Sequence, residues 1–188
     1  MQQYDYIILG SGASGLMLAY QMTSDSFFDN KQILLIDKDV KSQNDRTWCF
    51  WDKEVGIWEE IIKKKWDSIY FGSENFSKQI DISPYQYKLI RSEDFYNFIL
   101  KILNKKSNVT IVQENVTCLT NKSDVVVIET DAQMHIGDKV FNSIIFSPEY
   151  KDQKQYPVLN QHFVGWFIKT ELPVFDSKTA TFMDFTVA

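Results

Sequence analysis

The residues best suited to chemistry form a glycine-rich segment close to the N-terminus, with an acid downstream of it. Gly10, Gly12 and Gly15 follow the pattern Gly-x-Gly-x-x-Gly. In such a turn the first glycine permits a tight bend, the second lets the backbone approach a pyrophosphate, and the third lets helix and strand pack closely. Asp37 stands at a distance that suits an acid accepting both ribose hydroxyl groups and repelling a 2′-phosphate. The spacing predicts dinucleotide binding, with a purely structural glycine turn as the alternative.

A strand, a turn and a helix must hold these residues in place, and the surrounding sequence predicts all three. The apolar run 6–9 indicates a buried strand, and the pattern over 14–23 indicates a helix whose first N–H groups face the diphosphate. After a short polar loop at 27–31, residues 32–37 predict a second buried strand that ends on Asp37. The segment is a βαβ unit of ordinary size, and this context makes the glycine motif a specific signal.

Beyond residue 43 the predicted elements are short. Residues 44–51 have neither strand alternation nor a helix signature and predict an ordered loop, and Glu59-Glu60 with Lys63-Lys64 suit i,i+4 ion pairs on an exposed helix. A strand at 87–91 leads into a helix capped by Ser92. Strand signals follow, of which the first four suggest a small antiparallel meander: 109–112, 116–119, 125–130, 134–136, 140–146, 162–170 and 180–187, with a polar linker at 150–160.

The loop alone does not say which dinucleotide binds, because FAD and NAD both present an adenosine diphosphate. Its position at residue 10 is one guide, and the meander and returning strand that follow are another. Together they favour a flavoprotein over a dehydrogenase.

Composition excludes several classes of protein. Of 188 residues, 44% are hydrophobic, which is enough for a buried core and excludes a disordered chain. A net charge of −5 leaves no broad basic surface, so nucleic acid is not expected as a partner. Cys49 and Cys118 lie far apart and outside any metal-ligand spacing, so no metal is expected, and a reducing, cytoplasmic compartment is the simple interpretation. The sequence also lacks a signal-peptide pattern and an apolar stretch long enough for a membrane span.

Four further blocks lie in order along the chain. They are Asn-Asp-Arg-Thr-Trp-Cys-Phe-Trp at 44–51, Tyr-Lys-Leu-Ile-Arg-Ser-Glu-Asp-Phe-Tyr at 87–96, Gln-His-Phe-Val-Gly-Trp at 161–166 and Met-Asp-Phe at 183–185. With these blocks the sequence resembles the bacterial lycopene beta-cyclases, which are flavoprotein carotenoid cyclases. The resemblance covers nearly the whole chain, and the first, third and fourth blocks are much more specific than the glycine loop.

The resemblance implies an α/β fold with two parts. One is a Rossmann-like FAD-binding domain of the aromatic-hydroxylase type with a small antiparallel meander, and the other is the start of a β-rich substrate domain. The first is expected at residues 1–150 and the second at 151–188. The implied substrate is lycopene or a related acyclic carotenoid in a long apolar pocket.

The implied reaction has no net redox change, so the enzyme would be an isomerase, or intramolecular lyase. An acid protonates the terminal double bond, a second double bond attacks the resulting cation, and loss of a proton gives the β-ionone ring. Reduced FAD is required, as an electron-rich partner for the cation, and NAD(P)H serves as its reductant. Aromatic walls suit both the polyene and the cation, and the candidates are Trp48, Phe50, Trp51, Phe163, Trp166 and Phe167.

Matching positions give the residues that the resemblance places at the cofactor and the substrate. The expected cofactor-binding residues are Gly10, Ser11, Gly12, Ala13, Ser14, Gly15, Asp37, Lys38, Arg46, Arg91 and Val116, the last through its backbone to the adenine. The expected substrate contacts are Trp48, His162, Trp166 and Asp184. For Arg46 and Arg91 the alternative is a surface ion pair. For His162 it is a packed, hydrogen-bonded side chain, and for Asp184 a structural carboxylate at a strand end.

One departure from the family pattern concerns the proton donor. The family's acidic block of the Phe-x-Glu-Glu-Thr type is expected after Met-Asp-Phe and beyond Ala188, whereas Glu171 lies before Met-Asp-Phe in a different context. No catalytic residue is therefore expected in this chain, and the 188-residue polypeptide is expected to be an inactive N-terminal fragment. Two other classes stay open: an FAD-dependent oxidoreductase such as a hydroxylase or dehydrogenase, and a non-catalytic dinucleotide-binding module.

The implied substrate also bears on location, because lycopene resides in lipid bilayers. The expectation is a cytoplasmic protein with peripheral attachment at the inner face of the membrane. The sequence itself gives little support for attachment, since no long basic amphipathic helix is visible.

Overall fold

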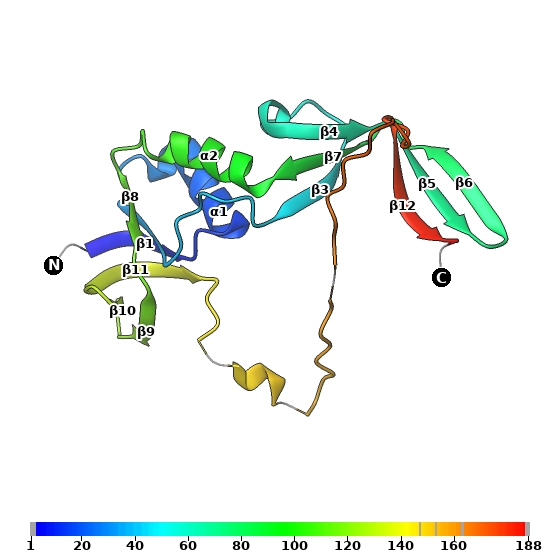
Figure 1. Cartoon of the computed structure of the whole chain (residues 1–188). Coiled ribbons are helices and arrows are strands. Elements are labelled where there is room, and N and C mark those ends of the chain that lie inside the picture. The colour runs from blue at the N-terminus through cyan, green and yellow to red at the C-terminus, as the bar shows by residue number, and fades with distance from the viewer. Residues whose placement is uncertain (1–2, 147, 153, 163, 187–188) are drawn as a thin grey trace. The chain divides into compact units, whose positions relative to one another are not determined.

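A computed structural model describes residues 3–146, 148–152, 154–162 and 164–186 (Figure 1). Its contacts group the chain into two compact units that interleave in the sequence. The first unit comprises Met1–Gln43 and Tyr96–Asn160, and the second comprises Asn44–Phe95 and Gln161–Ala188. The division into domains at residue 150 stays a prediction.

The first unit is built on a mixed six-stranded sheet with the order β8-β2-β1-β11-β10-β9. Its parallel strands are β8 (Val109–Gln113), β2 (Ile33–Asp37), β1 (Gln3–Leu9) and β11 (Met134–Asn142). On the other side of β11 the sheet is extended by β10 (Val126–Thr130) and then β9 (Val116–Asn121), and these three strands form an antiparallel meander. The predicted βαβ unit is confirmed, and β2 ends on Asp37.

Layers on both faces cover the parallel strands. Helix α1 (Ala13–Ser24) contacts β1 and β2, and Gly15 lies against Ile8. Ile7 and Leu9, which alternate with Ile8, pack on the other face with Val116 and Ile128 of the meander. The first unit also contains two short 3-10 segments, η1 (Ser26–Phe28) and η3 (Pro148–Lys151), and most of helix α2 (Ser92–Leu103). None of the helices in the described part of the chain is long and apolar enough to span a bilayer.

Two strand predictions for the first unit are wrong in detail. The pattern over 109–112 suggests a meander strand, but β8 pairs in parallel with β2. The patterns over 134–136 and 140–146 suggest two strands, whereas Met134–Asn142 forms the single strand β11. The polar stretch that interrupts the pattern begins with Gly137, where a Cβ would come within 2.7 Å of Ile7 Cδ1. Close packing on β1 therefore explains this glycine better than a turn does.

The second unit contains two three-stranded sheets. In the β3-β7-β4 sheet all neighbours are antiparallel, and the strands are β3 (Thr47–Asp52), β7 (Gln86–Arg91) and β4 (Ile62–Trp66). In the β12-β5-β6 sheet, β12 (Thr179–Phe185) runs parallel to β5 (Ser68–Ser73), and β6 (Phe76–Asp81) runs antiparallel to it.

Three predictions for the second unit are wrong. Residues 47–52 form strand β3 instead of a loop. Half-buried Trp48 and Phe50 alternate with exposed Cys49 and Trp51, and since all four side chains are aromatic or apolar, polarity does not reveal the two-residue period of the strand. The predicted exposed helix at 59–64 is a 3-10 turn, η2 (Glu59–Ile61), followed by β4. Residues 161–162 and 164–170 form no strand.

A buried lysine organises one face of the β3-β7-β4 sheet. The side chain of Lys88 is 2% exposed, and its Nζ donates to Asp52 Oδ2 at 3.1 Å and to Glu54 O at 2.7 Å. Glu59 Oε2 lies 3.5 Å from the same nitrogen, and Glu59 also pairs with Lys65. Burying an ammonium group without partners costs free energy, so Lys88 requires these contacts. They hold Asp52, Glu54 and Glu59, which lie at the end of β3 and in the connection to β4, at the Lys88 ammonium group.

Candidate functional site

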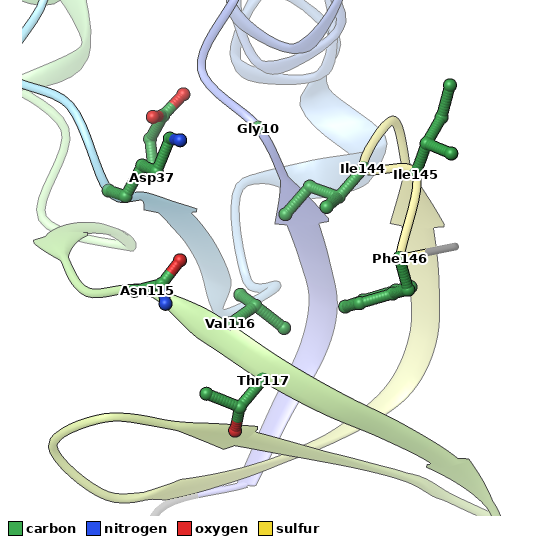
Figure 2. A pocket seen from close by; sticks show the side chains of 9 residues that line it. Gly10, Asp37, Asn115, Val116, Thr117, Ile144, Ile145 and Phe146 are labelled. Carbon is green, nitrogen blue, oxygen red and sulfur yellow. The ribbon is translucent and has the colours of Figure 1, made fainter. Parts of the chain in front are cut away.

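A cavity of about 370 Å³ opens at the carboxyl ends of β1 and β2 (Figure 2). Its lining comes from four segments of the first unit: Gly10, Asp37–Lys38, Asn115–Thr117 and Ile144–Phe146. Figure 2 shows Gly10 and Asp37 at the strand ends, with Val116 and Thr117 on β9 and Ile144–Phe146 leaving β11. Its volume suits part of a dinucleotide, in the crevice where open α/β sheets bind ligands.

Gly10 has the backbone conformation that the tight turn requires. Its φ is +97°, in the region that favours glycine, and a Cβ would come within 2.3 Å of Ser143 Oγ. Gly10 N donates to Ile36 O at 2.8 Å, and Ser143 Oγ donates to Leu9 O at 2.7 Å. The turn is thus fixed between the ends of β2 and β11.

Gly15 and Gly12 lack side chains for different reasons. At Gly15 a Cβ would lie 2.0 Å from Gly10 O, so the protein's own packing requires glycine. At Gly12 no heavy atom beyond the chain neighbours lies within 4 Å of a Cβ, and its φ of −68° is open to any residue. Since Gly12 is the N-cap of α1, the open space lies where a pyrophosphate would meet the first N–H groups of the helix.

The carboxylate of Asp37 holds the glycine loop and faces the cavity. Its Oδ2 accepts a hydrogen bond from Ser11 N at 2.6 Å and lies 3.4 Å from Lys41 Nζ. Its Oδ1 accepts from Asp39 N at 2.9 Å. A carboxylate oxygen can accept two hydrogen bonds, so Oδ1 retains capacity for a ribose hydroxyl. The ion pair with Lys41 was not foreseen from the sequence.

The remaining predicted loop residues surround the same strand ends. Ala13 is the first residue of α1, and Lys38 lines the cavity while its carbonyl accepts from Gln113 Nε2 at 3.1 Å. Ser11 lines an adjacent cavity of about 190 Å³ that also reaches Asp37. Ser14 lines a third cavity, of about 180 Å³, beside the end of β11.

Most of the wall formed by Asn115–Thr117 and Ile144–Phe146 was missed by sequence reasoning, which named only Val116. Val116 is buried, whereas Ile145 and Phe146 are exposed apolar side chains at the cavity. Ile144–Phe146 reach the cavity only because β11 pairs in parallel with β1, ending at Leu9 opposite Asn142. No local sequence signal reports that pairing.

Arg46 and Arg91 lie in the second unit, whereas the cavity lining comes from the first. Arg91 pairs with Thr47 at the start of β3, next to Arg46. The Arg46 backbone is fixed by Ser92, whose Oγ accepts from Arg46 N at 2.9 Å. Arg46 Nη1 donates to Asp45 O at 2.7 Å. A contact of either arginine with a cofactor stays a prediction.

The four predicted substrate residues belong to three segments of the second unit. Trp48 is half-buried and packs edge-to-face on Phe95, with ring centroids 5.4 Å apart. His162 and Trp166 are exposed in a segment without regular structure, and Phe163 lies outside the described residues. On β12, Asp184 accepts from Thr186 Oγ1 at 2.5 Å and from Thr186 N at 2.9 Å, which lowers the pKa of its carboxyl group.

Four aromatic side chains of the second unit form what we call the aromatic surface: Trp51, Trp66, Tyr87 and Phe182. Ring centroids of Tyr87 lie 4.8 Å from Trp51, 5.8 Å from Trp66 and 5.8 Å from Phe182. Trp51 and Phe182 remain 45% and 42% exposed, so this is a surface and not a core. Burial, and a hydrogen bond with the Cys49 thiol, raise the pKa of Tyr87 to about 12.

Comparison with solved structures identifies the fold. p-Nitrophenol 4-monooxygenase PnpA from Pseudomonas putida DLL-E4 matches 74% of this chain at 17% identity with a TM-score of 0.60. PqsL, a probable FAD-dependent monooxygenase from Pseudomonas aeruginosa, matches 86% at 12% identity and 0.63. The halogenase PltM, solved with phloroglucinol and FAD, matches 79% at 14% identity and 0.57. The chain therefore has the predicted fold, that of the FAD-dependent aromatic hydroxylases and halogenases.

The matched regions are 40%, 48% and 36% of the lengths of those three proteins, so this chain spans less than half of each. A comparison with curated proteins gives no match. A family model described as lycopene cyclase protein matches residues 5–188. That match extends from β1 through the glycine loop, both units and the end of β12, and on this evidence the chain belongs to the lycopene cyclase family.

Proposed function

We propose that this chain binds FAD and serves in a flavoprotein that converts the acyclic ends of lycopene or a related carotenoid into β-ionone rings. Two observations carry the proposal. The space beside Gly12 is open although the rest of the loop is tightly packed, and the chain that holds this loop belongs to the lycopene cyclase family. A glycine that packing does not require is explained by a ligand that approaches its backbone.

The first unit would hold the adenosine half of the cofactor. The Asp37 carboxylate would accept ribose hydroxyl groups, the first turn of α1 would donate to the pyrophosphate, and the backbone near Val116 would hold the adenine. Ser11, Ser14 and Lys38 border the same path. When bound, reduced FAD supplies an electron-rich ring that stabilises positive charge on the substrate, and NAD(P)H is the proposed reductant.

The second unit would contact the polyene. A flat conjugated chain stacks on exposed rings, and the negative faces of Trp and Tyr rings attract a carbocation. The aromatic surface offers such rings from four different strands, with no charged side chain among them. Trp48, His162, Trp166 and Asp184 remain proposed substrate contacts.

We propose none of the carboxyl groups with a lowered pKa as the proton donor. A general acid that works near neutral pH needs a raised pKa. The pKa is lowered at Asp5, Asp52, Glu114, Asp176 and Asp184. Asp184, the candidate nearest the family's acidic block, is stabilised as the anion by Thr186.

Attachment to the inner face of a membrane is proposed because the substrate partitions into lipid. The side chains of Val164, Trp166 and Phe167 are between 79% and 88% exposed. They form an apolar segment that is available to enter a lipid surface. Vesicle flotation of the chain with and without Trp166→Glu would test this part of the proposal separately.

Lycopene-producing cells that express the gene encoding this chain provide the test of cyclisation, with carotenoids separated by chromatography. The expected result is β-carotene, in an amount that falls when Gly12 is replaced by alanine. Gly56→Ala is the matched control, because a Cβ there would meet only Asp52 Oδ2 at an ordinary 3.6 Å.

Two results would overturn the proposal. The first is a hydroxylated or desaturated carotenoid formed with substrate-dependent oxidation of the flavin, which would indicate an oxidoreductase. The second is unchanged conversion by Gly12→Ala, which would separate cyclisation from the glycine loop.

A further inference from the structure

A buried acid and a buried histidine meet beside the nucleotide cavity without lining it. Glu114 and His135 are 9% and 5% exposed, and His135 Nε2 lies 2.7 Å from Glu114 Oε2. Because an ionised carboxylate only accepts hydrogen bonds, Nε2 carries the proton. Neither residue belongs to the glycine motif or to the cavity lining, so the cofactor contacts do not account for the pair.

The carboxylate of Glu114 has further donors from the β10–β11 turn. Thr130 Oγ1 donates to Oε2 at 2.8 Å, and Gln133 Nε2 donates to Oε1 at 2.9 Å. Burial raises the pKa of Glu114, but the hydrogen bonds from His135, Gln133 and Thr130 outweigh it and leave the pKa below its ordinary value. The carboxylate is therefore held as an anion by three side chains that follow it in the sequence.

The backbone of Glu114 connects this network to the cavity. Glu114 N donates to Asp37 O at 3.0 Å, and the next three residues, Asn115–Thr117, form one wall of the cavity. Asn115 N donates to Asp131 Oδ1 at 2.9 Å, and Asp131 N donates to Asn115 O at 3.0 Å. The connection between β8 and β9, which contains Glu114 and Asn115, is therefore held in two ways. Hydrogen bonds that involve side chains tie it to the β10–β11 region, and a backbone hydrogen bond ties it to the end of β2.

We infer that Glu114 and His135 are positioning residues, which set the affinity of the site for the adenosine part of the nucleotide by holding the Asn115–Thr117 wall at its distance from Asp37. The inference rests on the proposed function, since it assumes that the cavity binds an adenine nucleotide. Glu114 and His135 lie outside the cavity lining and would act on the nucleotide only through the position of the Asn115–Thr117 wall.

The geometry explains why the wall depends on this pair. The β9–β10 ladder is irregular next to the wall, where the register shifts between Glu129 and Thr130. An irregular ladder leaves a residue unpaired and holds the strand less firmly. The contacts of Glu114 with Thr130, Gln133 and His135 act at this point, so their loss would let Asn115 and Val116 move.

Titration calorimetry of the 188-residue chain with ADP, the probe for the shared adenosine diphosphate, tests the inference. His135→Leu removes the donor to Glu114, and the expected result is an affinity roughly ten-fold weaker, since a buried charged acceptor loses one partner. His135→Gln restores a side-chain donor and is expected to return the affinity to within about three-fold of the wild type. Glu129→Gln, an exposed carboxylate of the same hairpin, is the matched control and should leave the affinity unchanged.

Amide hydrogen exchange separates positioning from general destabilisation. In His135→Leu, exchange at Asn115–Thr117 should accelerate while Ile7 and Leu34 in the parallel strands stay protected. If His135→Leu does not fold, Glu114→Gln takes its place in both measurements, with the same expected results. Wild-type affinity in His135→Leu, or a loss that His135→Gln does not rescue, would overturn the inference. Failure of the wild type to bind ADP would instead overturn the proposed function beneath it.

Discussion

The replacement of Gly12 by alanine distinguishes a glycine kept for a ligand from one kept for the fold. A Cβ at Gly12 meets no atom within 4 Å beyond its chain neighbours, and its φ of −68° suits alanine. Alanine is a poorer N-cap than glycine, by less than about 1 kcal/mol, but it reduces the entropy of the unfolded chain by a similar amount. We therefore expect the free energy of unfolding to change by less than about 0.5 kcal/mol.

Binding should respond much more strongly. The added methyl group would occupy the position from which a pyrophosphate reaches the first N–H groups of α1. A hydrogen bond to a charged group contributes about 1.5–3 kcal/mol, so the loss of one such bond weakens binding roughly ten- to a hundred-fold.

Calorimetry with ADP, beside urea unfolding of the same protein, measures both quantities. Gly15→Ala is the counterpart, because its Cβ would lie 2.0 Å from Gly10 O and should cost about 1–3 kcal/mol of stability or more. Undiminished ADP binding by Gly12→Ala, or a loss of stability equal to that of Gly15→Ala, would refute the reasoning.

Three further predictions concern single side chains. Asp37→Asn should weaken ADP binding about ten-fold and narrow the preference for ADP over 2′,5′-ADP in competition assays, and an unchanged preference would contradict the ribose assignment. Lys88→Ala should lower the free energy of unfolding by about 2–4 kcal/mol because it leaves Asp52 and Glu59 without their buried partner. Lys65, whose side chain is 38% exposed, is the comparison: Lys65→Ala should cost less than about 1 kcal/mol, and equal losses in urea unfolding would contradict this prediction. The folded-state pKa of Glu114 is lowered, so its contribution to stability is present above its ordinary value of 4.5 and disappears as the pH falls through the folded pKa. The stability difference between wild type and Glu114→Gln should therefore shrink below pH 4.5, and a difference independent of pH would argue against an ionised Glu114 carboxylate.

The part of the site closest to the glycine motif was predictable because its determinants are local. Gly10 needs a positive φ, Gly15 needs close packing, and Asp37 needs only to end the second strand, so spacing in the sequence is enough to identify all three. Val116 was identified through the family resemblance and does line the cavity.

The rest of the site depends on pairing between distant segments. Ile144–Phe146 enter the cavity through the parallel register of β11 on β1, and Glu114 meets His135 across 21 residues through the meander. Strand β3 escaped notice because aromatic or apolar residues occupy both of its faces. In each case the missing information was the identity of a neighbouring strand, which a polarity pattern does not contain.

The central claim is that the cavity at Gly10, Asp37 and Val116 receives the adenosine diphosphate part of FAD. Titration of the 188-residue chain with FAD, repeated in the presence of saturating ADP, tests it most directly. We expect saturable binding of one FAD per chain, which ADP displaces and which Gly12→Ala weakens roughly ten- to a hundred-fold. A folded chain that does not bind FAD, or that binds FAD equally well with ADP present, would contradict it.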